Sequence, residues 1–202
     1  GMTGALLFGP LPEAVEVQGR AWAVRTDFRV WLRLMTLMAG PLSAEEKLAR
    51  ALARCYPAVP GDLAAAAEGL AWFFRCGAPA PERGEGAASA APCFSPEEDA
   101  ALLVAAFQQA YAVDLTEEGL HWWRFRALLE GLPDGTQLRH VMSLRAVRDG
   151  ELRELDPAMR RQVQRLRARY RLKGRAPEAL SERDRRLKRY VAARLGDDGK
   201  GD

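Results

Sequence analysis

Apolar and polar residues alternate along this chain with two different periods. In the first part, Val15-Glu16-Val17 and Trp22-Ala23-Val24 alternate around Gln18-Gly19-Arg20, which predicts a short β-hairpin. From about residue 26 onward, apolar positions recur every three or four residues, as they do along one face of a helix. Because an isolated hairpin is marginally stable in water, we expect it to pack against the helices.

Capping residues, glycine and proline mark where these helices begin and end. The predicted starts are Asp27 or Thr26, Ser43 with Glu46, Asp62, Ser95-Pro96-Glu97-Glu98, Thr116, Thr136, Asp156-Pro157, and Ser181 with Asp184. The predicted ends are Gly40-Pro41, Tyr56-Pro57, Gly77 and Gly131-Leu132-Pro133. The start at Ser95 is the sharpest, because a capping box coincides with proline at the first helical position. The pattern predicts a mainly α fold, a bundle of about seven helices preceded by a short N-terminal β-hairpin.

Residues 78–92 interrupt the helical pattern. They are rich in Gly, Pro, Ala and Ser and have no periodicity. Such a stretch either separates two subdomains or forms a flexible insertion at the surface of one domain, and we favour the insertion. We therefore expect a core of hairpin and helices over residues 1–150, a basic helical extension over residues 151–195, and a disordered tail over residues 196–202.

Charge is small in total and unevenly distributed. The net charge is +3, with sums of −4 over residues 1–150, +9 over residues 151–195 and −2 over residues 196–202. The three cysteines form no close pair and only two histidines are present, so we expect free thiols and neither a metal nor a cofactor. No apolar run approaches the roughly 20 residues that span a bilayer, which predicts a soluble intracellular protein without a membrane partner.

Two residue groups could be taken for catalytic centres. His121 could act as a general base, but no nucleophile stands near it in the sequence, and Glu117 would more naturally pair with it on a helix surface. Asp27 with Arg29 could form a charged active pair, but Asp27 is better interpreted as a helix cap. The chain also has no phosphate-binding loop, no dinucleotide-binding glycine pattern and no paired-cysteine spacing. We therefore expect a protein without enzymatic activity.

The stretch from Leu120 to Leu129 gathers Trp122, Trp123 and Phe125 on one predicted helix. Such a cluster is typical of a central core helix, and an exposed aromatic face for a partner protein is the alternative. Neighbouring residues on a helix point about 100° apart, so the two tryptophans are not expected to reach the same core. We therefore expect a mixture, with core packing as the main role.

An arginine-rich run follows near the C-terminus. It consists of Arg160, Arg161, Arg165, Arg167, Arg169, Arg171, Lys173 and Arg175. An exposed and unpaired run of this kind binds phosphates in a salt-dependent way, without reading a nucleic-acid sequence. A solvated helix face or a surface for an acidic protein explains the run as well, because the arginines interrupt no apolar stripe. We consider nucleic acid the less favoured partner.

Several motifs occur here in an order that resembles a known family. They are Leu11-Pro12, the Val-x-Val hairpin, Thr26-Asp27-Phe28-Arg29, Tyr56-Pro57, Trp72-Phe73-Phe74-Arg75-Cys76-Gly77, the acidic helix at 97–111, Val113-Asp114-Leu115 and His121-Trp122-Trp123-Arg124-Phe125-Arg126. The order resembles the bacteriophage family named after gene product fifteen, from about residue 11 to about residue 148. The insertion at 78–92 and the arginine-rich C-terminal extension depart from that family's pattern.

The resemblance implies a phage or prophage protein of the tail module, acting in the cytoplasm of the bacterial host. Proteins in that position are commonly regarded as tail assembly chaperones, so it implies binding to the tape measure protein, with the major tail protein as a second candidate. A structural tail component, a nucleic-acid-binding accessory protein and a homo-oligomer stay open. Under the chaperone hypothesis, the partner-binding residues are Trp122, Trp123, Phe125, Arg126, Arg160, Arg161, Arg165 and Arg169.

Overall fold

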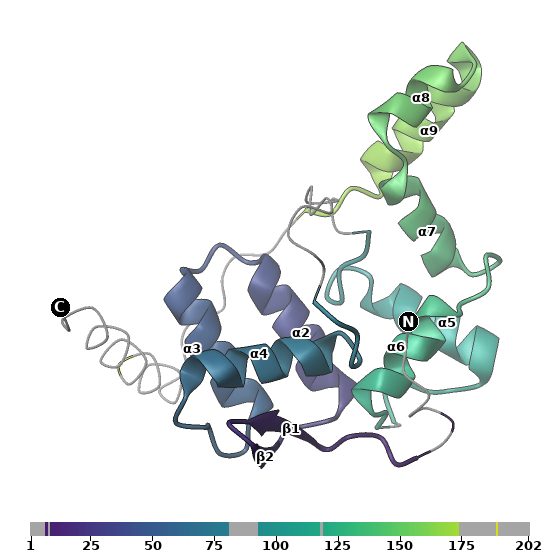
Figure 1. The fold of residues 1–202 in the computed structure, drawn as a ribbon. Coiled ribbons are helices and arrows are strands. Elements are labelled where there is room, and N and C mark those ends of the chain that lie inside the picture. Colours follow the sequence, from purple (N-terminus) through teal and green to yellow (C-terminus); the bar gives the residue numbers. More distant parts are fainter. Residues whose placement is uncertain (1–6, 8, 81–92, 118, 174–188, 190–202) are drawn as a thin grey trace. The chain divides into compact units, whose positions relative to one another are not determined.

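The computed structural model confirms the mainly α fold with its N-terminal β-hairpin (Figure 1). It describes residues 7, 9–80, 93–117, 119–173 and 189. The predicted helix that starts at Ser181, the tail at 196–202 and most of the insertion at 78–92 lie outside these residues. The described residues divide into two compact units, one of residues 9–80 and 119–127 and the other of residues 93–117 and 128–173.

The hairpin of the first unit pairs β1 (Ala14–Val17) with β2 (Arg20–Ala23) in antiparallel register, so that Val15 faces Trp22. Its two turn residues, Gln18 and Gly19, both have positive φ angles, as a tight hairpin turn requires. Val15 and Val17 are buried because β1 packs against helix α4 (Leu63–Phe74). Gly69 permits this close packing, since a Cβ atom there would lie 3.0 Å from a methyl carbon of Val15.

Helices α2 (Phe28–Ala39) and α3 (Ala44–Cys55) complete the helical part of the N-terminal segment. The predicted caps are confirmed: the Asp27, Ser43 and Asp62 side chains each accept a backbone N–H at the start of α2, α3 and α4. The carbonyls at the end of α3 accept hydrogen bonds from a residue that is remote in the sequence. Nη1 of Arg25 donates to the carbonyls of Ala53, Arg54 and Tyr56.

Residues 119–127 join the first unit through backbone pairing. The amide of Phe28 donates to the carbonyl of Leu120, and the amide of Trp122 donates to the carbonyl of Thr26. Helix α6 (Trp122–Glu130) therefore starts five residues later than predicted, and the cap assigned to Thr116 is wrong. Thr116 instead forms a turn with Asp114. Because residues 119–121 are not helical, Glu117 and His121 are not neighbours on one helix, and the predicted pairing between them is wrong.

The second unit contains helices α5 (Ala100–Tyr111), α7 (Gln137–Ala146), α8 (Asp149–Glu154) and α9 (Pro157–Arg169), together with the last residues of α6. Thr136 and Asp156 cap α7 and α9 as predicted. The Ser95 side chain accepts the backbone N–H of Glu98, as the predicted capping box requires. Residues 96–99 form a turn, and helix α5 itself begins after this turn, at Ala100. The short helix α8 was not predicted.

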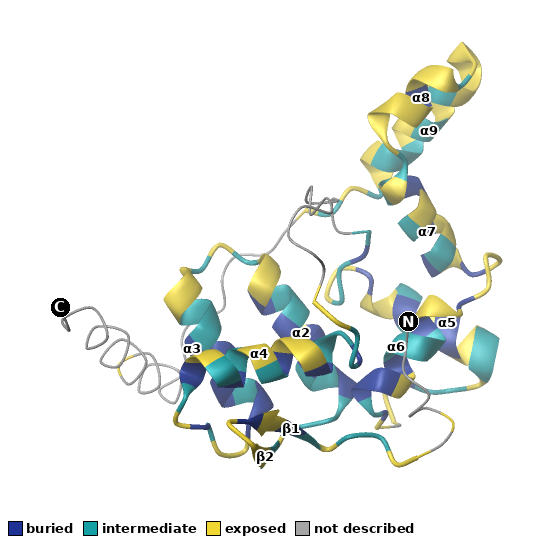
Figure 2. Cartoon of the chain, viewed as in Figure 1, coloured by how far each residue is buried: buried dark blue, intermediate teal, exposed yellow. Residues whose placement is uncertain are grey.

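Burial is uneven within the second unit. Helices α5 and α7 bury Leu103, Phe107, Leu138 and Val141, and they pack against each other. Helix α9 packs beside α7 and α8, yet it has no buried residue, and Figure 2 colours it as exposed or half-buried. The apolar stripe predicted for this helix is therefore only partly covered by the described part of the chain.

Candidate partner-binding surfaces

The aromatic residues of α6 lie in a stacked cluster at the centre of the first unit. Trp122 is fully buried, its ring 6.1 Å from the ring of Trp31 and 5.3 Å from that of Phe74. Phe125 stacks on Phe28 at 4.7 Å and is also fully buried. Aromatic pairs at these separations add to the free energy gained by burial itself. The cluster therefore holds α2, α4 and the start of α6 together.

The three buried indoles of this cluster all donate hydrogen bonds to backbone carbonyls. Nε1 of Trp31 donates to the carbonyl of Arg25 at 2.8 Å. The N–H groups of Trp122 and Trp123 donate to the consecutive carbonyls of Phe74 and Phe73, at 3.0 and 2.9 Å. These carbonyls belong to the last turn of α4, where a helix leaves carbonyls without an internal partner. The two neighbouring tryptophans thus cap the end of α4.

The expectation that Trp122 and Trp123 would not share one core is wrong. Both are buried, because both indole rings pack against the C-terminal end of α4, where their N–H groups donate to neighbouring carbonyls. Of the alternatives left open by the sequence, the structure shows the core role for Trp122, Trp123 and Phe125. These three side chains present almost no surface to a partner in this fold.

Arg126 lies at the edge of the aromatic cluster. Its guanidinium is 5.5 Å from the ring centre of Trp122 and 6.0 Å from that of Phe74, and the residue is half-buried. Trp72, 38 % exposed, packs edge-on against Trp123. Cation–π contacts of this kind stabilise the packing and leave part of the guanidinium accessible. Arg126 is therefore the only member of the predicted set on α6 that retains access to solvent.

His121 connects three parts of the first unit. Its Nε2 lies 2.9 Å from the carbonyl oxygen of Pro12, and its Nδ1 accepts the amide N–H of Trp123 at the start of α6. Only a neutral ring protonated on Nε2 satisfies both contacts. Burial lowers the pKa of His121 below 6.5, opposed by the contact with Pro12 and by the charge of Glu13. The histidine side chain thus caps the start of α6.

Replacing His121 with asparagine is expected to flatten the pH dependence of stability. The unfolded chain takes up this proton at the ordinary histidine pKa of about 6.5, whereas the folded protein takes it up only at lower pH. His121 thus contributes stability above about pH 6.5 that is lost as the pH falls through the lowered pKa. Asparagine accepts the Trp123 amide without titrating. Urea denaturation between pH 7.5 and about pH 5 measures the difference.

The matched control is His140→Asn, which changes the exposed histidine of the second unit. A change of slope in this variant as large as that in His121→Asn would show that the effect is not specific to the His121 cap. An equal slope in the wild type and in His121→Asn would show that the His121 cap does not titrate as described.

The predicted arginines of α9 divide into two groups. Arg160 is half-buried, and its Nη2 donates to the carbonyls of Arg153 and Leu155 at the end of α8. Arg161, Arg165 and Arg169 are exposed and stand four residues apart on one face of the helix. The structure thus brings three of the four predicted arginines together on the surface, while Arg160 holds α8 against α9.

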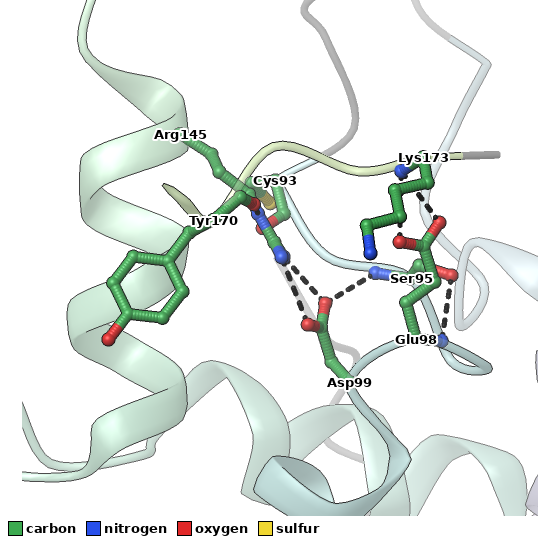
Figure 3. A network of polar contacts seen from close by, with 7 residues as sticks. All are labelled: Cys93, Ser95, Glu98, Asp99, Arg145, Tyr170 and Lys173. Atoms are coloured by element: carbon green, nitrogen blue, oxygen red, sulfur yellow. Dashed lines mark hydrogen bonds and ion pairs between the residues drawn. The ribbon is translucent and has the colours of Figure 1, made fainter. Parts of the chain in front are cut away.

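A polar network that was not predicted from the sequence connects the turn before α5, helix α7 and the end of α9 (Figure 3). Arg145 of α7 pairs with Asp99 through two contacts of 2.5 and 3.0 Å, and both side chains are largely buried. The same guanidinium donates to the carbonyls of Tyr170 and Cys93. Asp99 also accepts the backbone N–H of Ser95. The only sequence signal was an acidic residue directly before an apolar helix, which normally indicates a simple cap.

Other kinds of site find little support in the described residues. No group of three or more His, Cys, Asp or Glu side chains in that part of the chain could hold a metal ion. The prediction of free thiols is confirmed for Cys55, Cys76 and Cys93, and burial raises the pKa of the Cys55 thiol to about 12. Among the helices of residues 9–80, 93–117 and 119–173, none has the length and apolar character needed to cross a membrane.

Comparison with known proteins supports the resemblance seen in the sequence. A family model described as "Bacteriophage Gp15 protein" matches residues 7–172. The match extends beyond residue 148, where the sequence resemblance ended, so α8 and α9 lie inside the matched region. No curated protein and no solved structure matches the chain.

Proposed function

The chain belongs to the Bacteriophage Gp15 protein family, and on this premise we propose that it is a tail assembly chaperone that binds the tape measure protein during virion morphogenesis. It would act in the host cytoplasm by protein contact alone, without catalysis and without a cofactor. A tape measure protein is long and helical, and it exposes apolar seams before the tail tube encloses it. A chaperone for such a protein needs an accessible surface that accepts amphipathic helices.

The observation that carries this proposal is the incomplete cover of α9. This helix of 13 residues has no buried residue, although Met159, Val163, Leu166 and Tyr170 recur along one face. Met159 is 46 % exposed. An amphipathic helix normally buries its apolar stripe against its own core, and a stripe left partly open is available to a helix of another protein. Because the aromatic residues of α6 are buried, we propose α9 as the binding surface.

We expect the tape measure protein of the same phage to stay soluble when a fragment of it is co-expressed with this chain. The two proteins should co-purify at low salt, and the complex should largely persist at high salt, because apolar contacts are not screened by ions. Solubility of the fragment and its recovery on the tagged chain measure both effects. The absence of association at either salt concentration would contradict the chaperone proposal.

Two exposed methionines provide a matched pair of variants for this experiment. Met159→Glu places a charge on the open stripe of α9 and is expected to reduce recovery of the fragment. Met38→Glu changes a methionine of α2 that is 53 % exposed, and recovery is expected to stay at the wild-type level. Equal recovery with Met159→Glu and wild type would remove α9 from the binding surface.

Nucleic-acid binding is the competing function, because α9 carries five arginines and no acidic residue. Phosphate binding of this kind weakens steeply as salt concentration rises. A chain that leaves the tape measure fragment insoluble, and instead binds duplex DNA with a steep salt dependence, would support this function.

A further inference from the structure

The five arginines of α9 differ in how they are used within the structure. Arg160 donates to the carbonyls of Arg153 and Leu155, at 2.8 and 3.0 Å. Nη1 of Arg167 pairs with Asp149 of α8 at 3.1 Å. Both contacts hold α8 and α9 against each other. These two guanidiniums are therefore engaged inside the unit and are not the part of α9 that is open to a partner.

The remaining three arginines, Arg161, Arg165 and Arg169, form a row along α9. They are spaced four residues apart, so they project from one face at intervals of about 6 Å along the axis. All three are exposed, and Arg169 also lies over the ring of Tyr170 at 5.6 Å. No carboxylate in the described part of the chain pairs with Arg161 or Arg165. Like charges at this spacing weaken a helix unless negative charge comes alongside.

We propose that this arginine row binds an acidic amphipathic helix of the partner protein, whose carboxylates repeat every four residues. A partner helix lying along α9 has the same rise per turn, so its carboxylates meet successive arginines. Guanidinium groups bind carboxylates through two parallel hydrogen bonds, which strengthen the contact and fix its orientation. The identity of the partner as a tape measure segment rests on the proposed function, whereas the chemistry of its binding face does not.

The surroundings of the row favour a protein helix over nucleic acid. Residues 149–173 carry eight basic and four acidic residues, a net charge of +4, and all four acidic residues are exposed. Glu151 and Glu154 of α8 would repel a continuous chain of phosphates. The row is also adjacent to apolar surface, because Leu166 lies next to Arg169 around the helix and Met159 is 46 % exposed. Apolar surface beside positive charge complements an amphipathic helix with acidic residues along one edge.

The test is the affinity of the full-length chain for a labelled helical peptide with glutamate at every fourth position and leucine on the adjacent face. Fluorescence anisotropy is expected to show saturable binding. Arg161→Glu with Arg165→Glu replaces two attractions by repulsions and is expected to weaken binding at least tenfold. The variant Arg161→Gln with Arg165→Gln adds no repulsion, so a smaller loss of affinity is expected. It keeps the test valid if the charge-reversed variant folds poorly.

The matched control is Arg33→Glu with Arg124→Glu. Both residues are exposed on helices of the first unit, and the change in net charge is the same. Affinity is expected to change less than twofold. A second control peptide has the same composition with its glutamates gathered at one end, and it should bind more weakly than the regular peptide.

The inference would be overturned by no binding of the regular peptide, by equal binding of the rearranged peptide, or by equal losses of affinity in the row variant and its control. Tighter binding of duplex DNA than of the peptide, abolished by the row variant, would also overturn it and assign the row to phosphates. These outcomes are separate from the chaperone test. A tape measure fragment that co-purifies equally with the wild type and the row variant would leave the proposed function intact while rejecting this binding face.

Discussion

Replacing Trp122 with alanine is expected to destabilise the first unit by about 3–5 kcal/mol, the range found when a large buried side chain is removed from a core. Trp122 is fully buried and stacks with Trp31, Phe74 and Phe125. Alanine would leave a cavity among these rings and would also remove the hydrogen bond to the carbonyl of Phe74. Urea denaturation followed by circular dichroism measures the loss.

Two further tryptophan variants separate the causes of this loss. Trp72→Ala removes the same side chain from a position that is 38 % exposed, and a cost below about 2 kcal/mol is expected because less apolar surface returns to water. Trp122→Phe retains a stacked ring but loses the indole N–H, so its cost should lie between the two alanine variants. A Trp122→Ala protein as stable as Trp72→Ala would show that Trp122 is not part of the core and would reopen its role as a partner anchor.

Replacing Asp99 with alanine is expected to cost about 3–5 kcal/mol, because it leaves a largely buried guanidinium without its counter-charge. The side chains of Asp99 and Arg145 are 5 % and 10 % exposed. Their contacts connect the turn before α5, the helix α7 and the end of α9 (Figure 3). Thermal denaturation measures the loss. Hydrogen exchange should show faster exchange at the start of α5 and at residues around Tyr170.

The surface ion pair of Asp134 with Arg139 provides the matched control in the same unit. Its side chains are 95 % and 38 % exposed, so Asp134→Ala is expected to cost less than about 1 kcal/mol. The double variant Asp99→Ala with Arg145→Met should cost less than the sum of its single changes, because it removes the unpaired buried charge together with its partner. Additive costs would show that Asp99 and Arg145 do not act as a pair.

The residue types correctly predicted the helix starts that are set by a capping side chain nearby in the sequence. The caps at Asp27, Ser43, Asp62, Thr136 and Asp156 are all confirmed. Each depends on a side chain that accepts an amide two or three residues ahead, so the information lies within a few residues. The hairpin follows in the same way from alternation around a two-residue turn. The short helix α8 gave a weaker signal because it spans six residues and buries only Leu152.

The candidate site was predicted only in part, because the sequence shows which residue types are present and not how their side chains pack. The sequence showed that α6 is aromatic and that the C-terminal helices are basic, and family membership is confirmed. It did not show that the end of α4 receives both indoles, nor which arginines of α9 bind α8. Residue types alone do not distinguish an aromatic core from an aromatic surface, because both use the same side chains.

The sequence by itself determined the fold class, the hairpin, most helix starts and the family, because caps, turns and periodicity act over a few residues and the motifs occur in a fixed order. Only the tertiary structure decided where α6 begins, that Trp122 and Trp123 share one core, and that Arg161, Arg165 and Arg169 face solvent. The physical reason is distance along the chain. The amides and carbonyls of residues 120–122 pair with residues 26–28, so contacts between remote segments override the local start signal at Thr116. Ser95 keeps its predicted contact with the amide of Glu98.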